Sequence, residues 1–352
     1  MRTHHRSRVL ATALAALTAA AGLAGCSRAD SSSGPAQNQG AAAEVRVGYF
    51  PNVTHAPALI GTKKDFFAKE LGKTKLTTQT FNAGPDEVNA LLGNSLDVAF
   101  IGSGPAINAF TKSKGTIQLV AGAVSGGAQL VVKPDITSVE QLKGKTIATP
   151  QLGNTQDVAL KKFLAEKKLT DQVKVTALDN PKTFDTFKKG EVDGGWLPEP
   201  WSSRLVADAG AKVLVDEKSL WPQGKFPSTV VIVRSEFLQQ HPETVRALLK
   251  GELAAIDWAK ANPAEAKTVV NGALKELTGN TLGEAVLDRS FSGIELTADP
   301  VAAQFPQLAK DSVTAGIVKE AVNLKGFADF GPLNEVLKAQ GQPAVSAPEL
   351  TK

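Results

Sequence analysis

Residues 96–107 read LDVAFIGSGPAI, an apolar run that ends in small residues and a proline. Within it, Asp97–Ile101 predicts a buried β-strand, because the run is short and apolar and is followed by glycine. Pro105 predicts the first turn of a helix that continues to Lys112. A strand that passes directly into a helix is the repeating unit of α/β folds.

The same alternation continues on both sides of this segment. Around it, the sequence predicts strands at 45–50, 75–81 and 117–124 and helices at 57–70 and 85–92. This order of strands and helices is typical of a parallel sheet with helices on both faces.

A second alternating series follows the first. Its predicted strands, with helices between them, are 129–132, 146–149, 174–178, 192–196 and 213–215. A last strand at 229–233 (TVVIV) precedes a C-terminal part that is almost entirely helical. We therefore expect two doubly wound α/β lobes, joined where the chain crosses near 124–130 and 224–230, with the helical tail packed on the first lobe.

The N-terminus has the pattern of a secretory signal. Three arginines precede an alanine-rich run, and the segment ends in Leu23-Ala24-Gly25-Cys26. A basic head, a short apolar middle and small residues at the end predict a signal peptide over 1–25. The last four residues resemble the lipobox of bacterial lipoproteins, in which Cys26 would carry the lipid anchor; the alternative is a plain signal peptide with a chance cysteine. Residues 26–43 are small and polar and predict a flexible tether.

The charge and cysteine counts exclude several classes of protein. The 352 residues contain 39 basic and 35 acidic side chains, but the three arginines of the signal segment leave 36 against 35, a net charge of +1. This balance does not favour a nucleic-acid partner. A single cysteine excludes an internal disulfide framework and a thiolate zinc cluster.

Catalytic and cofactor motifs are missing from the sequence. Outside the signal segment the only histidines are His55 and His241, and no serine lies in a G-x-S-x-G elbow. Gly102-Ser103-Gly104 follows a strand, but Ile107 stands where a dinucleotide-binding motif has its third glycine. We expect no catalytic residue, no cofactor and no metal site.

Several predicted strands end in loops of neutral hydrogen-bond donors. These candidate binding residues are Asn52, Thr54 and His55; Ser103 and Gly104; Ser125, Gly126 and Gly127; and Asn154 and Thr155. Ligands of α/β lobes bind beyond the carboxyl ends of the strands, and helix N-termini attract anions. Because none of these loops contains Lys or Arg, we expect a dehydrated oxyanion held by neutral donors. The alternative is that these residues are ordinary caps and turns.

The segment 194–201, GGWLPEPW, is the other candidate for a cleft wall. Trp196 and Trp201 could close an apolar cleft, and Glu199 could accept hydrogen bonds there. The alternative is that a tryptophan belongs to the core.

Four segments together resemble the extracytoplasmic substrate-binding proteins of ABC importers, and among them the branch that binds aliphatic sulfonates, taurine and nitrate. They are GYFPNVTHAPALIG (48–61), LDVAFIGSGPAI (96–107), LKGKTIATPQLGNTQD (142–157) and WLPEPW (196–201). The resemblance implies a two-lobed, type II periplasmic-binding-protein-like fold, with 44–128 plus 230–352 as one lobe and 129–229 as the other. It also implies that the cleft is lined by the candidate residues above. Asn154 departs from the pattern, because related proteins often carry a small hydroxyl residue there.

The function implied by this resemblance is transport, not catalysis. We expect a monomeric lipoprotein, anchored at the extracytoplasmic face of the cell membrane, that delivers an aliphatic sulfonate or taurine to the transmembrane subunits of an ABC permease. Nitrate and a pyrimidine precursor of thiamine are alternative ligands. An enzyme on the same scaffold and a structural surface lipoprotein are the alternatives from other classes.

Overall fold

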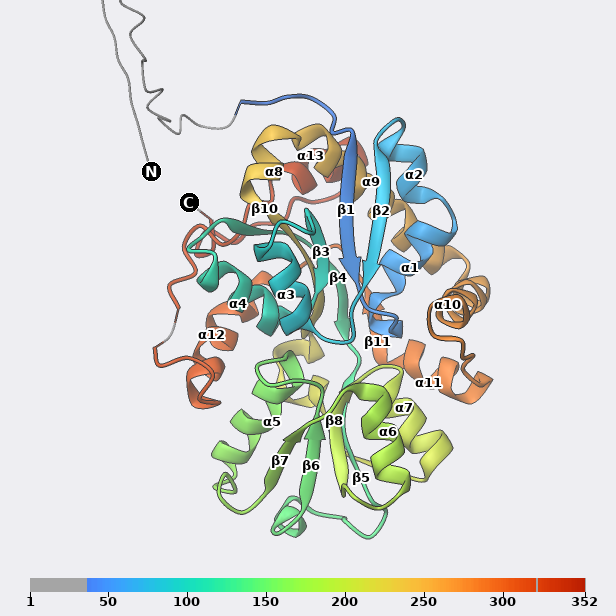
Figure 1. The fold of residues 1–352 in the computed structure, drawn as a ribbon, viewed down its shortest axis with the longest axis vertical. Helices are drawn as coiled ribbons and strands as arrows, with labels where there is room; N and C mark the ends of the chain where they lie inside the picture. Colours follow the sequence, from blue (N-terminus) through green and yellow to red (C-terminus); the bar gives the residue numbers. More distant parts are fainter. Residues whose placement is uncertain (1–36, 321, 352) are drawn as a thin grey trace, which may run out of the picture. The chain divides into compact units, whose positions relative to one another are not determined.

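The computed structural model describes residues 37–320 and 322–351. The predicted signal peptide and the lipobox Cys26 lie outside these residues, as does most of the predicted tether. The described residues form two β-sheets, and each sheet is covered by helices on both faces (Figure 1).

The larger sheet contains strands from distant parts of the chain. They are β1 (Glu44–Tyr49), β2 (Lys75–Thr80), β3 (Val98–Ile101), β4 (Ile117–Gly126), β10 (Pro227–Arg234) and β11 (Ile294–Leu296). Their order is β11-β4-β10-β3-β1-β2. β1 is parallel to β2 and β3, but β10 lies between β3 and β4 and is antiparallel to both. The predicted parallel sheet is therefore mixed, because the strand that returns from the second lobe enters in the opposite direction.

The helices that connect and cover these strands come from both ends of the chain. The N-terminal ones are η1 (Val53–His55), α1 (Ala56–Lys63), α2 (Phe66–Leu71), α3 (Gly84–Leu92) and α4 (Ser103–Lys112). The C-terminal ones are α8 (Ser235–Gln240), α9 (Pro242–Ala261), α10 (Pro263–Thr278), α11 (Glu284–Gly293), η5 (Ala302–Gln304), α12 (Phe305–Thr314) and α13 (Gly331–Ala339). The helix predicted over 57–70 is two helices, interrupted at Asp65, whose φ of 57° is left-handed.

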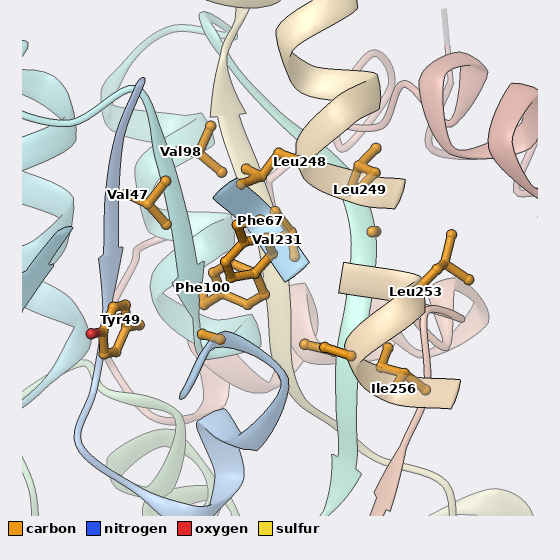
Figure 2. Packing of buried hydrophobic residues seen from close by; sticks show 14 of the residues in the cluster. Val47, Tyr49, Phe67, Val98, Phe100, Val231, Leu248, Leu249, Leu253 and Ile256 are labelled. Carbon is orange, nitrogen blue, oxygen red and sulfur yellow. The ribbon is translucent and has the colours of Figure 1, made fainter. Parts of the chain in front are cut away.

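Strand β10 shows why the larger sheet needs helices on both faces. Val231 and Val233 pack with α1, α2 and α9, as Figure 2 shows for Val231, Phe67 and Leu248. Val230 and Ile232 point to the opposite core, with α3, α4 and α12. Successive side chains of a strand point to opposite faces, so a continuous apolar run is stable only when both faces are covered.

The smaller sheet is built from the middle of the chain. Its strands are β5 (Ala128–Val132), β6 (Thr146–Thr149), β7 (Lys174–Ala177), β8 (Gly194–Pro198) and β9 (Lys212–Asp216). The helices of this region are η2 (Val139–Leu142), α5 (Thr155–Glu166), α6 (Asn180–Lys188), α7 (Trp201–Ala209), η3 (Glu217–Leu220) and η4 (Pro222–Gly224). The strand order is β7-β6-β8-β5-β9. Val132 packs toward α5 and Val131 toward α6 and α7, so both faces of this sheet are also buried.

Two neighbouring strands carry the chain between the lobes. β4 ends at Gly126 and β5 begins at Ala128, and β10 runs back beside β4. Gly126 and Gly127 have φ values of 77° and 80°, a left-handed conformation that glycine adopts without strain. The amide of Gly126 donates to the carbonyl of Phe226 at 2.9 Å, which ties the two crossings together.

The C-terminal helices contact both lobes rather than the first lobe alone. α9, α10 and α13 pack in the core of the larger sheet. α11 also contacts α7, and α12 contacts α5, both of which belong to the second lobe. Among the described residues, none of the helices combines the length and the apolar character that crossing a membrane requires.

Candidate functional site

The strand ends of both lobes meet around one small pocket, which we call the inner pocket. Its lining residues are Phe50, Asn52, Thr54, His55, Asn82, Gly102, Asn154, Thr155, Gln156, Asn180, Pro198, Ser228 and Thr229. β1 and β3 lead into it from the first lobe, and β6 and β8 lead into it from the second. The lobes are closed on each other here, because the cavity volume is about 20 Å³, room for roughly one water molecule.

The N-termini of α4 and α5 face each other beside this pocket. The amide of Gly104 donates to Thr155 Oγ1 at 3.3 Å, across the two lobes. Since Thr155 Oγ1 accepts this bond, its own proton is available to a ligand. The approach depends on Gly102, because a Cβ atom there would lie 2.4 Å from Thr155 Oγ1. The first N–H groups of each helix have no acceptor within the helix and carry partial positive charge.

His55 is a neutral member of the pocket. Its ring is 2% exposed, lies 4.4 Å from the ring of Phe50 and accepts a hydrogen bond at Nδ1 from the Phe50 amide at 3.3 Å. Burial lowers the pKa of His55 to about 3, so the ring is uncharged at physiological pH. With Nδ1 accepting, the proton of the neutral ring is on Nε2, which makes Nε2 a donor.

The inner pocket therefore offers hydrogen bonds without charged side chains. Among the described residues, its lining contains no Lys, Arg, Asp or Glu. Asn180 adds an amide group, whose Nδ2 can donate and whose buried Oδ1, an acceptor, has no hydrogen-bond partner in the described part of the chain. Neutral donors and helix N-termini suit a small oxyanion that has been stripped of water.

Direct hydrogen bonds hold the lobes together around the pocket. Trp201 Nε1 donates to Asn52 Oδ1 at 2.9 Å, and Gln151 Nε2 donates to Asp86 Oδ2 at 2.9 Å. Each of these bonds joins a residue of the second lobe to one of the first.

A larger cavity, which we call the outer cleft, adjoins the inner pocket on the side of α6, α7 and α10. Its volume is about 490 Å³, and its lining includes Phe81, Phe184, Trp201, Arg204, Leu277 and Asn280. Asn52, Asn82 and Asn180 line both cavities. The two cavities thus share a wall of asparagine side chains.

The structure brings part of the predicted binding set together. Asn52, Thr54, His55, Asn154 and Thr155 line the inner pocket. Ser103 and Gly104 lie beside it at the start of α4, where the buried Ser103 hydroxyl has no hydrogen-bond partner among the described residues. Trp201 lines the outer cleft instead.

Other predicted residues lie away from the pocket, at the crossing between the lobes. Ser125 Oγ accepts from the Phe226 amide at 3.2 Å, and Gly126 and Gly127 form the crossing itself. The Glu199 carboxylate accepts from the Ser203 amide and from Ser290 Oγ, both at 3.1 Å, so it joins α7 to α11. None of these residues lines the inner pocket.

Trp196 belongs to the core of the second lobe, which was the alternative stated for it. It is fully buried, packs edge-on against Phe163 with ring centres 5.5 Å apart, and donates from Nε1 to Glu217 Oε2 at 3.0 Å. Burial raises the pKa of Glu217 to about 8 despite this hydrogen bond. The buried pair fixes η3 against β8 and does not reach the cleft.

Eight lining residues were not among the individually predicted binding residues, although Gly102 and Pro198 lie in the loops that the sequence singled out. The eight are Phe50, Asn82, Gly102, Gln156, Asn180, Pro198, Ser228 and Thr229. Asn180 follows the strand 174–177 and begins α6, so the strand-end pattern used for the other loops could have found it. Ser228 and Thr229 could not be found that way, because they reach the pocket only through the insertion of β10 between β3 and β4. Among the described residues, no group of three His, Cys, Asp or Glu side chains could hold a metal ion.

Known proteins resemble this chain in sequence and in fold. The chain is 30% identical to the taurine-binding periplasmic protein of Escherichia coli over 226 residues, which cover 64% of this chain and 69% of that one. Its fold matches the alkanesulfonate-binding protein SsuA from Xanthomonas axonopodis pv. citri, bound to MOPS, with a TM-score of 0.68, 22% identity and coverage of 80% and 96%.

The fold also matches the periplasmic nitrate-binding protein NrtA from Synechocystis PCC 6803, with a TM-score of 0.72, 16% identity and coverage of 87% and 92%. These likenesses confirm the two-lobed periplasmic-binding-protein fold. The profile of the NMT1-like family matches residues 38–273, about two thirds of the sequence. The chain therefore belongs to the NMT1-like family.

Proposed function

We propose that this protein is the extracytoplasmic substrate-binding component of an ABC importer that captures an aliphatic sulfonate or taurine between its two lobes. The relative named for taurine and the structure named for alkanesulfonate support this proposal. In this role the protein is a carrier and not an enzyme. It delivers its ligand to the transmembrane subunits of the permease.

The observation that carries the proposal is the uncharged donor set of the inner pocket. A sulfonate has three acceptor oxygens and no proton at any physiological pH, so it needs donors only. Thr155 Oγ1, the Nε2–H of His55 and the first amides of α5 are such donors. Within each lobe these groups are positioned by strand ends and helix starts, so the closing of the lobes around the anion is the main reorganisation that binding requires.

The mechanism that follows is hinge closure. The donors come from both lobes, so a bound anion completes its contacts only when the lobes are together. The crossings at Gly126–Gly127 and beside β10 are the segments about which the lobes would turn. Closure then creates the surface that the permease recognises.

The N-terminal sequence gives this function its location. In our proposal residues 1–25 direct secretion, and the lipidated Cys26 and the tether to residue 43 keep the binding lobes at the outer face of the cell membrane. The lobes are then 44–128 plus 230–352 and 129–229. The binding residues proposed from the sequence are retained where they line the two cavities or the start of α4.

Nitrate is the second candidate ligand. A structural neighbour is named for nitrate, and the inner pocket is small enough to favour a small planar anion. The pyrimidine alternative has less support, because the Glu199 carboxylate that would bind the ring donors is already engaged by Ser203 and Ser290.

Calorimetry on the purified protein tests the assignment. We expect saturable heat with short alkanesulfonates or taurine, and weaker or no heat with nitrate, sulfate and an aminopyrimidine. Tight binding of nitrate with no response to any sulfonate would replace the first ligand by the second. A response to the aminopyrimidine alone would overturn both.

A further inference from the structure

Arg204 is held in the outer cleft by two aromatic rings. Its guanidinium carbon lies 4.4 Å from the ring centre of Phe184 and 4.9 Å from that of Trp201. Stacking of this kind stabilises the cation and fixes the plane of the guanidinium. Phe184 comes from α6 and Trp201 from α7, so the position of Arg204 is set by two elements.

The hydrogen-bonding edge of this guanidinium is available. Its one ionic contact among the described residues is a long one, 3.8 Å from Nε to Asp208 Oδ2, and Asp208 is exposed. The described hydrogen bonds include none from the Arg204 side chain. A planar guanidinium with free in-plane N–H groups is the side chain best suited to bind a carboxylate or another planar anion in a fork.

The outer cleft is also larger than nitrate or a short alkanesulfonate would fill. Its volume of about 490 Å³ compares with about 20 Å³ in the closed inner pocket, and the two share Asn52, Asn82 and Asn180. An anion in the inner pocket would therefore project its substituent past these asparagines toward Trp201 and Arg204. Nitrate, or a sulfonate with one or two carbons, would leave the cleft filled with water.

We propose that the ligand is an organosulfonate that carries a second acidic group, and that Arg204 binds this group in the outer cleft. The proposal rests on the function proposed above and adds the chemical class of the substituent. Asp185, which lines the same cleft, is exposed and forms no ion pair with Arg204, so the contact with Asp208 is the one ionic contact of the guanidinium among the described residues. A terminal ammonium, as in taurine, would instead meet a like charge at Arg204.

Pairs of ligands that differ only in the terminal group test this inference. Sulfoacetate, sulfopropanoate and sulfobutanoate are titrated against ethane-, propane- and butanesulfonate by calorimetry. We expect at least one sulfocarboxylate to bind roughly tenfold tighter than its alkyl counterpart, which is typical of a charged hydrogen bond. The chain length of the best ligand reports the distance between the two anion sites.

The matched variants are Arg204→Met and Arg246→Met. Arg204→Met should remove the tenfold preference and leave the affinity for butanesulfonate within about twofold, since a charge-assisted hydrogen bond is lost only to the acidic end. Arg246 lies on α9, outside the lining of both cavities, and pairs with Glu335, so Arg246→Met controls for the loss of one positive charge. Arg204→Lys, which keeps the charge but not the fork, should retain part of the preference.

The outcomes separate this inference from the proposed function. Equal affinities for both ligand series, or a preference that survives Arg204→Met, would overturn the role of Arg204 and leave the sulfonate assignment intact. Failure of every sulfonate to bind would overturn the sulfonate assignment and this inference with it. If Arg204→Met does not fold, the comparison of ligand pairs on the unaltered protein and on Arg204→Lys decides the question.

Discussion

The inner pocket and the outer cleft adjoin each other but offer a ligand different kinds of contact. The inner pocket is small, buried and lined only by uncharged groups, with a histidine whose pKa is lowered to about 3. The outer cleft is wide and aromatic and carries Arg204 over two rings. In the function that we propose, the inner pocket selects the anionic head and the outer cleft selects what is attached to it.

The neutrality of the inner pocket predicts the largest effect, which is on stability in acid. The pKa of His55 is about 3 in the folded protein and about 6.5 in an unfolded chain. Below pH 6.5 the unfolded chain thus binds a proton that the folded protein does not. Above pH 6.5 this proton does not affect the free energy of unfolding. As the pH falls from 6.5 toward 3, protonation of His55 in the unfolded chain lowers the free energy of unfolding by at most about 1.4 kcal/mol per pH unit.

Denaturant unfolding between pH 4 and 7 measures this slope. His55→Gln should reduce the slope, whatever its effect on stability at neutral pH. His241→Gln, at the one other histidine of the described residues, is measured alongside as the matched control. Equal slopes for the unaltered protein and His55→Gln would show that His55 is protonated in the folded state as readily as in the unfolded chain. The inner pocket would then not be uncharged in acid.

Closure of the inner pocket predicts the next effect. Gly102→Ala should lower the affinity for butanesulfonate by roughly thirtyfold, or about 2 kcal/mol, because the added methyl group meets Thr155 Oγ1 across the lobes. Its φ of −66° and ψ of 151° suit alanine, so the melting temperature without ligand should change little. Because Thr155→Ala removes the clash and also a proposed donor, the double variant is compared with Thr155→Ala alone, and in that background Gly102→Ala should cost little affinity. A full thirtyfold loss in that background would mean that the loss does not come from the clash with Thr155.

The smallest expected change in affinity comes from substituting two asparagines, which tests whether the two cavities act separately. Asn180 lines both cavities and can donate from its Nδ2 amide to an anion there, whereas Asn280 lines the outer cleft alone. Asn180→Ala should lower the affinity for butanesulfonate roughly tenfold, near the lower end of what one hydrogen bond to a charged group contributes. Asn280→Ala should leave it within twofold. An equal loss from both variants would indicate that the cavities act as one site.

Sequence patterns predicted the fold class more completely than they predicted which residues line the inner pocket. The strand-end rule located Asn52, His55 and Thr155 because a parallel strand and the helix after it fix where the loop lies. It failed for Ser228, which reaches the pocket through the pairing of β10 with β3 and β4. Pairing between segments more than a hundred residues apart leaves no local signal.

The tryptophans show a second limit of sequence reasoning. Trp196 and Trp201 are five residues apart in one unusual segment, and the sequence favoured the cleft for at least one of them. Their places are decided by the end of β8: Trp196 lies within the strand and faces the core, and Trp201 begins α7 and faces the outer cleft. Side-chain direction in a central strand depends on register, which composition does not reveal.

The position of β10 has a consequence for the order in which the protein can be made. Its place between β3 and β4 means that the first lobe is finished only after the whole second lobe has been synthesised. Until then β3 and β4 present unpaired edges, a state that folds slowly and invites aggregation. A chain built in this order remains incompletely folded through most of its synthesis, which is compatible with export through a narrow channel before folding.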